Sequence, residues 1–240
     1  MKLEKTTKIP GVDFKRRYND ACAAAHALDL IGDRWALLVL RELMIGPRRF
    51  SDVKAGLPGI SANILTQRLA ELEAVGLLTR RELPPPAAAR VYELTRWGYE
   101  AEPILKVLGM WAARSPLHDP AMAFSPASFV LSLRTMFSPA RAGYARLRIG
   151  FRVTRGDGAP VTCVAEVAAG EFTFEPAPLD GVETVVTGAP EAIAGVIYGG
   201  MALTDMIAAE ALAVTGNAAE FERFATWFPL PDKADLTEGT

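Results

Sequence analysis

Apolar residues between Phe50 and Gly76 recur at helical spacing, and the first half of the chain is organised around this stretch. Ser61 can cap the start of a helix and Gly76 can end one, which predicts a helix from Ser61 to about Val75. Its apolar stripe consists of Leu65, Leu69, Leu72 and Val75. Its opposite face is small and polar and carries Asn63, Thr66, Gln67, Ala70 and Glu71, with Arg68 at the edge. The turn GLPGIS joins it to a preceding helix, as in a helix-turn-helix.

Two short strands follow, Leu77–Leu83 and Arg90–Leu94, separated by PPPAAA, a stiff tip of polyproline character. Arg80, Arg81 and Arg90 make this hairpin basic. Amides, hydroxyls and a guanidinium on the preceding helix suit a major groove, and wing arginines suit phosphates or a minor groove. The pattern is typical of a winged helix; the alternative is an ordinary surface helix beside a solvated hairpin.

The segments before this motif read as two helices. An alanine-rich helix spans about Ala21 to Ile31, Gly32 breaks it, and Asp33 is expected to cap a helix over Arg34–Ile45. The expected inward face of that helix is Trp35, Leu38, Val39 and Leu43. Gly46 and Pro47 end it, and Arg48 and Arg49 then stand where a helix-turn-helix meets the DNA backbone.

After the hairpin, Thr95 is expected to cap a helix that reaches Arg114, with a kink or break at Pro103. An apolar stripe beyond Pro103 consists of Ile104, Val107, Leu108 and Trp111. We interpret it as a dimerisation surface together with the first helix, and the alternative is packing within one subunit. A lone winged helix has little surface with which to specify an operator of useful length.

Residues 20 to 115 resemble the HxlR family of winged-helix transcriptional regulators. The matching pieces are ALDLIGDRW, ALLVLREL, RRFSDVKAGLPGIS, LTQRLAELEAVGLLTR, RVYELTRWG and PILKVLGMW. The resemblance implies a homodimer that binds double-stranded operator DNA and usually represses. With the motifs above, it gives as DNA-binding candidates Arg48, Arg49, Ser61, Asn63, Thr66, Gln67, Arg68, Arg80, Arg81 and Arg90. Ala23 departs from the family, which often has proline after the cysteine.

Cys22 matches the cysteine near the start of HxlR-type domains, which in some members senses oxidants or electrophiles. A redox-active thiol needs exposure and a lowered pKa. We expect instead a small buried thiol on the alanine-rich helix, with thiol sensing as the alternative. Cys163 is expected in the core, and His26 and His118 have no partners at metal-ligand or triad spacing.

Composition bounds the function. The chain has 240 residues, half of them hydrophobic, and only 2 cysteines, which fits one or two packed domains in a reducing cytosol. The first 20 residues lack a signal-peptide core, and no apolar run is long enough to span a membrane. Residues 1 to 115 hold 18 Lys and Arg against 13 Asp and Glu, and residues 116 to 240 hold 8 against 15. Only the first half therefore has the charge sign that DNA binding favours.

The second half begins after the proline-rich segment 115–127. Ser125 and Pro126 open a helix through Phe137, and residues 144 to 154 alternate as a half-buried antiparallel strand. VTCVAEVA, EFTFEP and ETVVTG predict three more strands in a meander. Helices are expected near Pro190, near Leu203 and from Asn217 to Trp227, with a short strand ALAVTG before the last.

This order, with TGAPEAI, the YGG turn and AVTGN, resembles the sterol-carrier-protein-like domain over residues 125 to 230. The resemblance implies helices on a curved sheet around an apolar tunnel for lipid-like ligands. Candidate lining residues for an effector pocket are Phe129, Leu133, Phe137, Ile197, Met201, Met206, Phe221, Phe224 and Trp227. The alternative is that these side chains fill a core.

The sequence thus predicts an α+β protein with an arm (1–19), a winged-helix DNA-binding and dimerisation domain (20–115), a linker (116–124), a sterol-carrier-like ligand-binding domain with an antiparallel sheet (125–232) and a tail (233–240). The predicted function is that of a cytoplasmic, homodimeric repressor on a palindromic operator, modulated by a small apolar effector. We expect no enzyme activity, cofactor, metal or membrane insertion. The alternatives are a regulator switched through Cys22 and a lipid-binding carrier with a vestigial winged helix.

Overall fold

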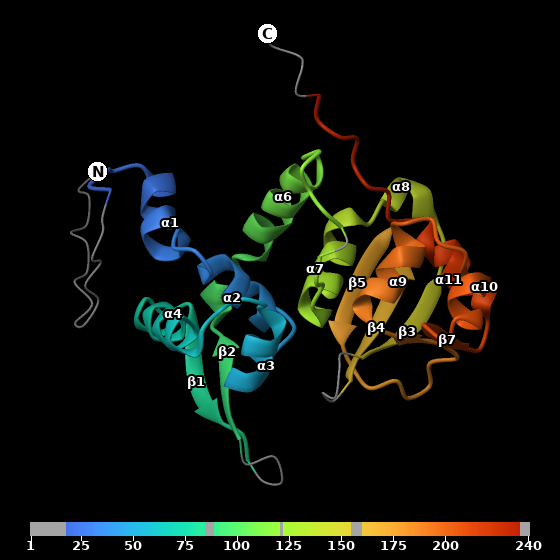
Figure 1. The fold of residues 1–240 in the computed structure, drawn as a ribbon, viewed down its shortest axis with the longest axis horizontal. Coiled ribbons are helices and arrows are strands. Elements are labelled where there is room, and N and C mark those ends of the chain that lie inside the picture. The colour runs from blue at the N-terminus through green and yellow to red at the C-terminus, as the bar shows by residue number, and fades with distance from the viewer. Residues whose placement is uncertain (1–17, 85–88, 121, 155–159, 236–240) are drawn as a thin grey trace. The chain divides into compact units, whose positions relative to one another are not determined.

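The structure, a computed structural model, describes residues 18–84, 89–120, 122–154 and 160–235. Most of the predicted arm and of the hairpin tip lie outside these residues. The chain divides into two compact units, residues 1–101 and 102–240 (Figure 1). The predicted linker follows residue 115, so this division comes one helix earlier. No helix among the described residues combines the length and apolar character needed to cross a membrane.

The first unit has the predicted order of helices and strands. Its elements are α1 (Ala23–Ile31), α2 (Ala36–Leu43), α3 (Phe50–Gly56), α4 (Ala62–Ala74), β1 (Leu78–Glu82), β2 (Arg90–Leu94) and α5 (Arg96–Tyr99). The strands pair antiparallel from Leu78 opposite Leu94 to Glu82 opposite Arg90. Thr95 caps α5 as predicted, because its hydroxyl accepts a hydrogen bond from the Gly98 amide. The winged helix-turn-helix topology is thus complete within this unit.

The start of α2 differs from the prediction. The helix begins at Ala36, and its N-cap is Trp35, whose backbone is left-handed with φ of 82°. Trp35 is therefore not part of the helix and does not belong to its inward face. Val39 and Leu43 are buried as predicted, but Leu38 is exposed. Leu40, with no exposed surface, fills the inward position instead. Asp33 does not cap the helix with its side chain.

The second unit has a mixed five-stranded sheet. Its elements are α6 (Glu102–Ala113), α7 (Pro126–Met136), α8 (Pro139–Ala142), β3 (Leu147–Val153), β4 (Val161–Ala168), β5 (Glu171–Pro176), β6 (Thr184–Gly188), α9 (Pro190–Ile197), α10 (Leu203–Ala208), β7 (Leu212–Thr215) and α11 (Ala218–Ala225). The α5–α6 junction places the predicted break just before Pro103. Ser125 caps α7 as predicted, accepting a hydrogen bond from the Ser128 amide.

The sheet was predicted to be a wholly antiparallel meander, and this is wrong for β6. The strand order is β5-β4-β3-β6-β7, and β6 runs parallel to β3. The connection from β5 therefore crosses the sheet before β6 begins. Gly150 in β3 permits the crossing, because a Cβ atom there would lie 2.8 Å from a methyl group of Leu179 and 3.2 Å from one of Val182. A side chain at this position would occupy the space the crossing segment fills.

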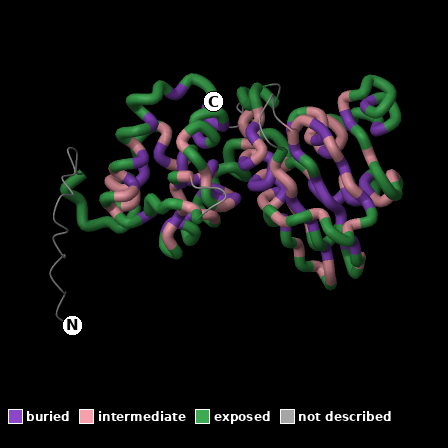
Figure 2. Tube along the Cα trace, turned by 90° about the horizontal axis from the view of Figure 1, so that it is seen from below, coloured by how far each residue is buried: buried purple, intermediate pink, exposed green. Residues whose placement is uncertain are grey.

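The core of the second unit is aromatic. Phe129 of α7, Phe151 of β3 and Phe174 of β5 are fully buried, with ring centroids 5.2 to 5.9 Å apart. Helix α7 packs against β5 and α11 against β6, and Figure 2 shows buried positions along the strands beneath them. Along β3 the predicted alternation is confirmed, since Leu147, Ile149, Phe151 and Val153 are buried while Arg148 and Arg152 are exposed. Cys163 is buried as predicted.

Helix α6 is fastened to the second unit at both ends. At its start, Glu102 pairs with Arg134 of α7 at 2.9 Å. At its end, the Lys233 ammonium donates to the carbonyls of Ala113 and Ser115 at 3.0 and 3.1 Å, and the Ala234 amide donates to Arg114 O at 2.7 Å. The C-terminal segment thereby satisfies carbonyls that the end of a helix leaves unpaired. These contacts place α6 in the second unit.

Candidate nucleic-acid interface

Helix α4 presents the predicted polar face. Ser61 caps it by accepting a hydrogen bond from the Ile64 amide at 3.2 Å, which fixes the first turn. Leu65, Leu69 and Leu72 are buried and anchor the opposite side. Asn63, Thr66 and Gln67 are all exposed. The side chains predicted to meet base edges thus lie on the exposed side of a helix whose other side is buried.

Two of these side chains already make hydrogen bonds within the helix. The Thr66 hydroxyl donates to Ala62 O at 2.9 Å, and the Gln67 amide nitrogen donates to a Glu71 carboxylate oxygen at 2.8 Å. Both bonds are exposed to solvent and are contacts between neighbouring turns of the helix. The Gln67 carbonyl oxygen and the Thr66 lone pairs retain acceptor capacity for a base edge.

Arg68 stands apart from the other candidates. Its side chain is only 13% exposed and pairs with Asp33, before α2, and with Glu71 at 2.6 Å. Asp33, which the sequence led us to expect as a helix cap, instead holds this guanidinium. Arg68 therefore positions α4 against the start of α2, and its charge is engaged inside the protein.

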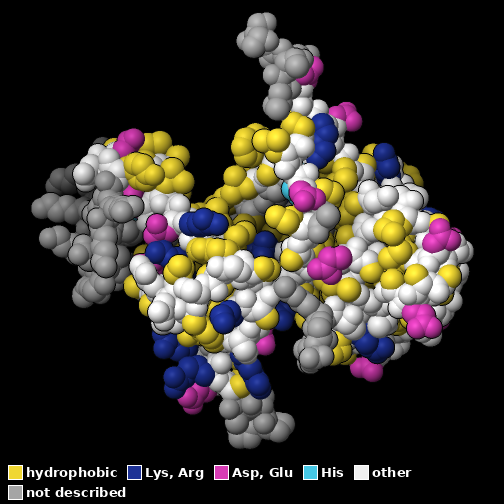
Figure 3. Space-filling view, in the orientation of Figure 1, with side chains coloured by type: hydrophobic (Ala, Val, Ile, Leu, Met, Phe, Trp, Pro, Cys, Tyr) yellow, Lys and Arg dark blue, Asp and Glu magenta, His cyan; other side chains and the backbone are white. Residues whose placement is uncertain are grey.

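The wing arginines are exposed and paired with carboxylates. Arg80 contacts Glu73 at 2.8 Å and lies over the Tyr92 ring, Arg81 contacts Glu93 at 2.5 Å, and Arg90 contacts Glu82 at 3.5 Å. Figure 3 shows Lys and Arg side chains gathered over this hairpin. Exposed ion pairs contribute only about 0–1 kcal/mol each. A phosphate can therefore replace these carboxylates at small cost.

Arg48 and Arg49 stand at the start of α3. The backbones of Arg48 and Tyr92 exchange two hydrogen bonds, of 2.9 and 2.8 Å, which tie this turn to β2. Arg49 is the N-cap residue of α3, and its amide donates to Asp52 at 3.2 Å. The Arg49 side chain is exposed and that of Arg48 is partly so. Both arginines thus lie at the start of α3, and their contact with the DNA backbone stays a prediction.

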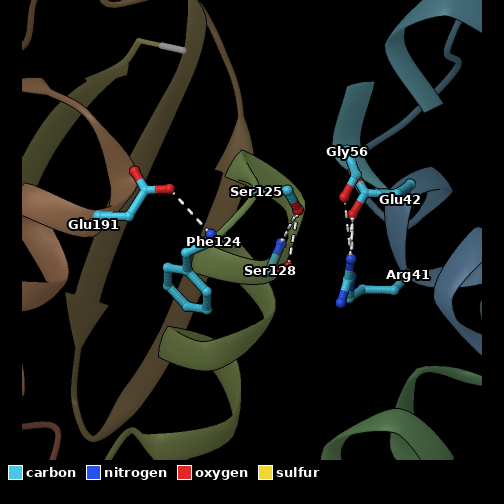
Figure 4. Close-up of polar contacts among 7 residues, drawn as sticks. All are labelled: Arg41, Glu42, Gly56, Phe124, Ser125, Ser128 and Glu191. Carbon is cyan, nitrogen blue, oxygen red and sulfur yellow. Dashed lines mark hydrogen bonds and ion pairs between the residues drawn. The ribbon is translucent and has the colours of Figure 1, made fainter. Parts of the chain in front are cut away.

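A buried ion pair that the sequence reading missed sets the position of α3. Glu42 is 4% exposed, and the Arg41 guanidinium donates to its carboxylate at 2.8 Å and to Gly56 O at 3.5 Å (Figure 4). A Cβ atom on Gly56 would lie 2.0 Å from the Glu42 carboxylate. The signal was available in the sequence as two adjacent charges inside the otherwise apolar ALLVLREL.

Two helices expose apolar side chains. On α6, Ile104, Val107, Leu108 and Trp111 are 43%, 69%, 41% and 74% exposed, while Leu105 is buried. On α1, only Ile31 is buried and Leu28 is 51% exposed. Contiguous exposed apolar surface on a protein of this kind marks an interaction site. The α6 stripe is exposed within the second unit, and its role as a dimerisation surface stays a prediction.

The expectation of a buried Cys22 is wrong. The thiol is exposed at the N-cap of α1, because the helix begins at Ala23, two residues later than predicted, and only Ile31 at its far end is buried. The nearby backbone amides of Ala25 and Ala24 lower the pKa of the Cys22 thiol. Both conditions that a reactive thiol requires are therefore met.

The predicted effector-pocket residues mostly form the core. Phe129, Leu133, Ile197, Met206, Phe221, Phe224 and Trp227 are buried, Phe137 is partly exposed and Met201 is 50% exposed. The aromatic members pack on one another, for example Phe224 on Trp227 with ring centroids 5.9 Å apart. The second unit also has two open depressions, of about 370 and 440 Å³, and of the nine residues only Phe137 lines either.

The chain is similar to known regulators over its first half. The HxlR-like helix-turn-helix family matches residues 30–118. The HTH-type transcriptional regulator YvaP of Bacillus subtilis (strain 168) is 37% identical over 86 residues, which are 36% of this chain and 80% of YvaP. The reduced form of YodB from B. subtilis is 32% identical over 41% of this chain and 98% of that one, with a TM-score of 0.37. The quinone-bound YodB is 31% identical over 38% and 94%, with a TM-score of 0.33.

The family match covers the elements from α2 to α6, including the capped polar helix and the arginine hairpin. Since the chain spans four fifths of YvaP at 37% identity, it belongs to the HxlR-like helix-turn-helix family.

Proposed function

We propose that this chain is a DNA-binding transcriptional regulator that acts as a homodimeric repressor on a palindromic operator. The observation that carries the proposal is the exposed face of α4, with Asn63, Thr66 and Gln67 beside an arginine-bearing hairpin. A helix of this kind fits a major groove, and the arginines of the wing fit the phosphates next to it. The exposed stripe of α6 supports the dimer, which would bind two half-sites about 34–36 Å apart.

Gln67→Ala is expected to relax specificity at one or two operator positions, with a loss of about 1–3 kcal/mol if Gln67 reads a base. Arg90→Ala is the matched contrast, because it should weaken binding to operator and random DNA alike and flatten the salt slope by about one unit. Fluorescence anisotropy on both DNAs at several salt concentrations measures both effects. Equal losses on operator and random DNA for Gln67→Ala would contradict base reading.

A second candidate function is thiol sensing through Cys22. The exposed thiol with its lowered pKa supports it, as does similarity to YodB, of which a quinone-bound structure exists. The prediction is that a quinone modifies Cys22 before the buried Cys163 and changes operator affinity at least about fivefold, the lower end of ordinary coupling between sites. Cys22→Ser should abolish the response and Cys163→Ser should keep it, as measured by mass spectrometry and anisotropy. Modification without any change in affinity would remove sensing from the function.

For the second unit we propose a sterol-carrier-like, ligand-binding role with no catalytic step. Its support is the helix-covered sheet with an apolar core, in the order of elements expected for such domains apart from the crossing before β6. A ligand alters DNA affinity only if it binds two states of the dimer unequally. A carrier with a vestigial winged helix is the competing function, and salt-dependent binding to its own promoter DNA distinguishes the two.

A further inference from the structure

The larger of the two depressions described above, about 440 Å³, lies among α6, α7 and β5. Its volume falls in the range of small-molecule sites. The residues that matter are Glu102 and Lys106 of α6, Arg134 of α7, Phe137 directly after α7, and Phe172 and Glu175 of β5. It is separate from the aromatic core that was predicted to hold the effector.

One wall of the depression is a buried guanidinium. The Arg134 side chain is 8% exposed and donates to Glu102 at 2.9 Å, to Glu175 at 2.5 Å and to Phe174 O at 2.9 Å. These bonds use three of its five N–H groups. The other two N–H groups make no hydrogen bond among the described residues.

A second cation lies beside it. Within the described residues, Lys106 makes no hydrogen bond or ion pair, although its side chain is partly buried and lines the depression. Burial of an ammonium without a partner is unfavourable, so an anion at this position would be stabilised. Two cations, one of them with no internal partner, favour a carboxylate.

Glu175 is the protein group that such a carboxylate would displace. Burial raises the pKa of the Glu175 carboxyl, the Arg134 charge lowers it, and the nearby Glu102 charge raises it further. The balance is upward, so the Glu175 anion is less stable here than in water. Its side chain is 62% exposed and can turn towards solvent when a ligand binds.

Two aromatic side chains also line the depression. The rings of Phe137 and Phe172 stack with centroids 4.6 Å apart and planes at 22°, and both side chains are partly exposed. A flat ring laid on this pair continues the stack at the usual aromatic separation. The depression is therefore lined by both apolar and cationic side chains.

We propose that this depression binds a small aromatic monocarboxylate, with its carboxylate on Lys106 and Arg134 and its ring on Phe137 and Phe172. The proposal deepens the proposed ligand role of the second unit and rests on it. Because Glu102 and Lys106 belong to α6, an occupied site changes the contacts that hold this helix.

The test is calorimetric titration of the full chain with benzoate, phenylacetate and 2-naphthoate, with benzamide as the uncharged counterpart. At least one carboxylate should bind, and benzamide should bind about tenfold or more weakly, since bonds to charged groups are the stronger ones. Lys106→Gln should lose about tenfold in carboxylate affinity. Lys54→Gln, an exposed lysine on α3, is the matched control and should lose none. Thermal unfolding of each variant confirms that it is folded.

Failure of all three carboxylates to bind, or equal affinities in the wild type and Lys106→Gln, would overturn the proposal. Operator affinity is measured on the same preparations without and with the carboxylate. Operator binding without carboxylate binding would contradict the proposed carboxylate site and leave the proposed regulator function standing. Carboxylate binding without operator binding leaves the site standing and removes the proposed regulator function.

Discussion

Val107→Glu is expected to dissociate the proposed dimer and to weaken operator binding about a hundredfold or more. Val107 is 69% exposed in the middle of the α6 stripe, so a glutamate there keeps the chain folded. In a dimer interface the same carboxylate would be buried without a partner. A monomer also loses the avidity that comes from engaging two half-sites at once, which is typically worth about 10²–10⁴. Light scattering gives the mass, and anisotropy gives the affinity.

Tyr144→Glu is the matched control, because Tyr144 is a large side chain that is 96% exposed in the second unit and lies outside α6. It should keep both the dimer and the operator affinity. A Val107→Glu protein that stays dimeric, or a Tyr144→Glu protein that becomes monomeric, would show that the α6 stripe is not the dimer contact.

Arg134→Ala is expected to lower the free energy of unfolding of the second unit by about 2–4 kcal/mol. Removal of this buried guanidinium leaves Glu102, Glu175 and the Phe174 carbonyl without their partner. The loss stays below that of a fully buried pair, because the Glu175 side chain is 62% exposed and can be hydrated. Urea denaturation followed by aromatic fluorescence measures the change.

Arg152→Ala provides the comparison, since Arg152 is exposed on β3 and has no ion pair among the described residues. Its effect should stay within about 0.5 kcal/mol, as for ordinary surface substitutions. If the two variants unfold at the same urea concentration, the bonds of Arg134 to Glu102, Glu175 and Phe174 O do not fasten α6 to this unit.

The first unit was predictable from sequence because its signals are local. Ser61 and Thr95 cap α4 and α5 with bonds to amides three residues on, and Gly76 has a φ of 79° where a helix must end. In the second unit β4 and β5 have the predicted bounds, because period-two alternation and the turn between them are also local.

What the sequence could not supply depends on contacts between distant residues. Nothing near Arg68 indicates that Asp33 will neutralise it, and nothing near β6 indicates that it pairs with β3 and not with β5. The exposure of Cys22 depends on where α1 finds its packing partners, which an alanine-rich sequence leaves open. The Arg134 cluster joins α6, α7 and β5, which only the fold brings together.

The hydrogen bonds from Lys233 and Ala234 to the end of α6 affect the order in which parts of the nascent chain can fold. Lys233 holds the carbonyl of Ala113, a contact between residues 120 apart in the chain. Closing so long a loop carries an entropic cost that only a folded second unit can offset. At about 5–20 residues per second, the ribosome adds this length in roughly 6–24 s. The hydrogen bonds that hold the end of α6 to this segment therefore form only after residue 234 has been synthesised, so we expect nascent chains to carry a folded winged helix before the proposed dimer can form.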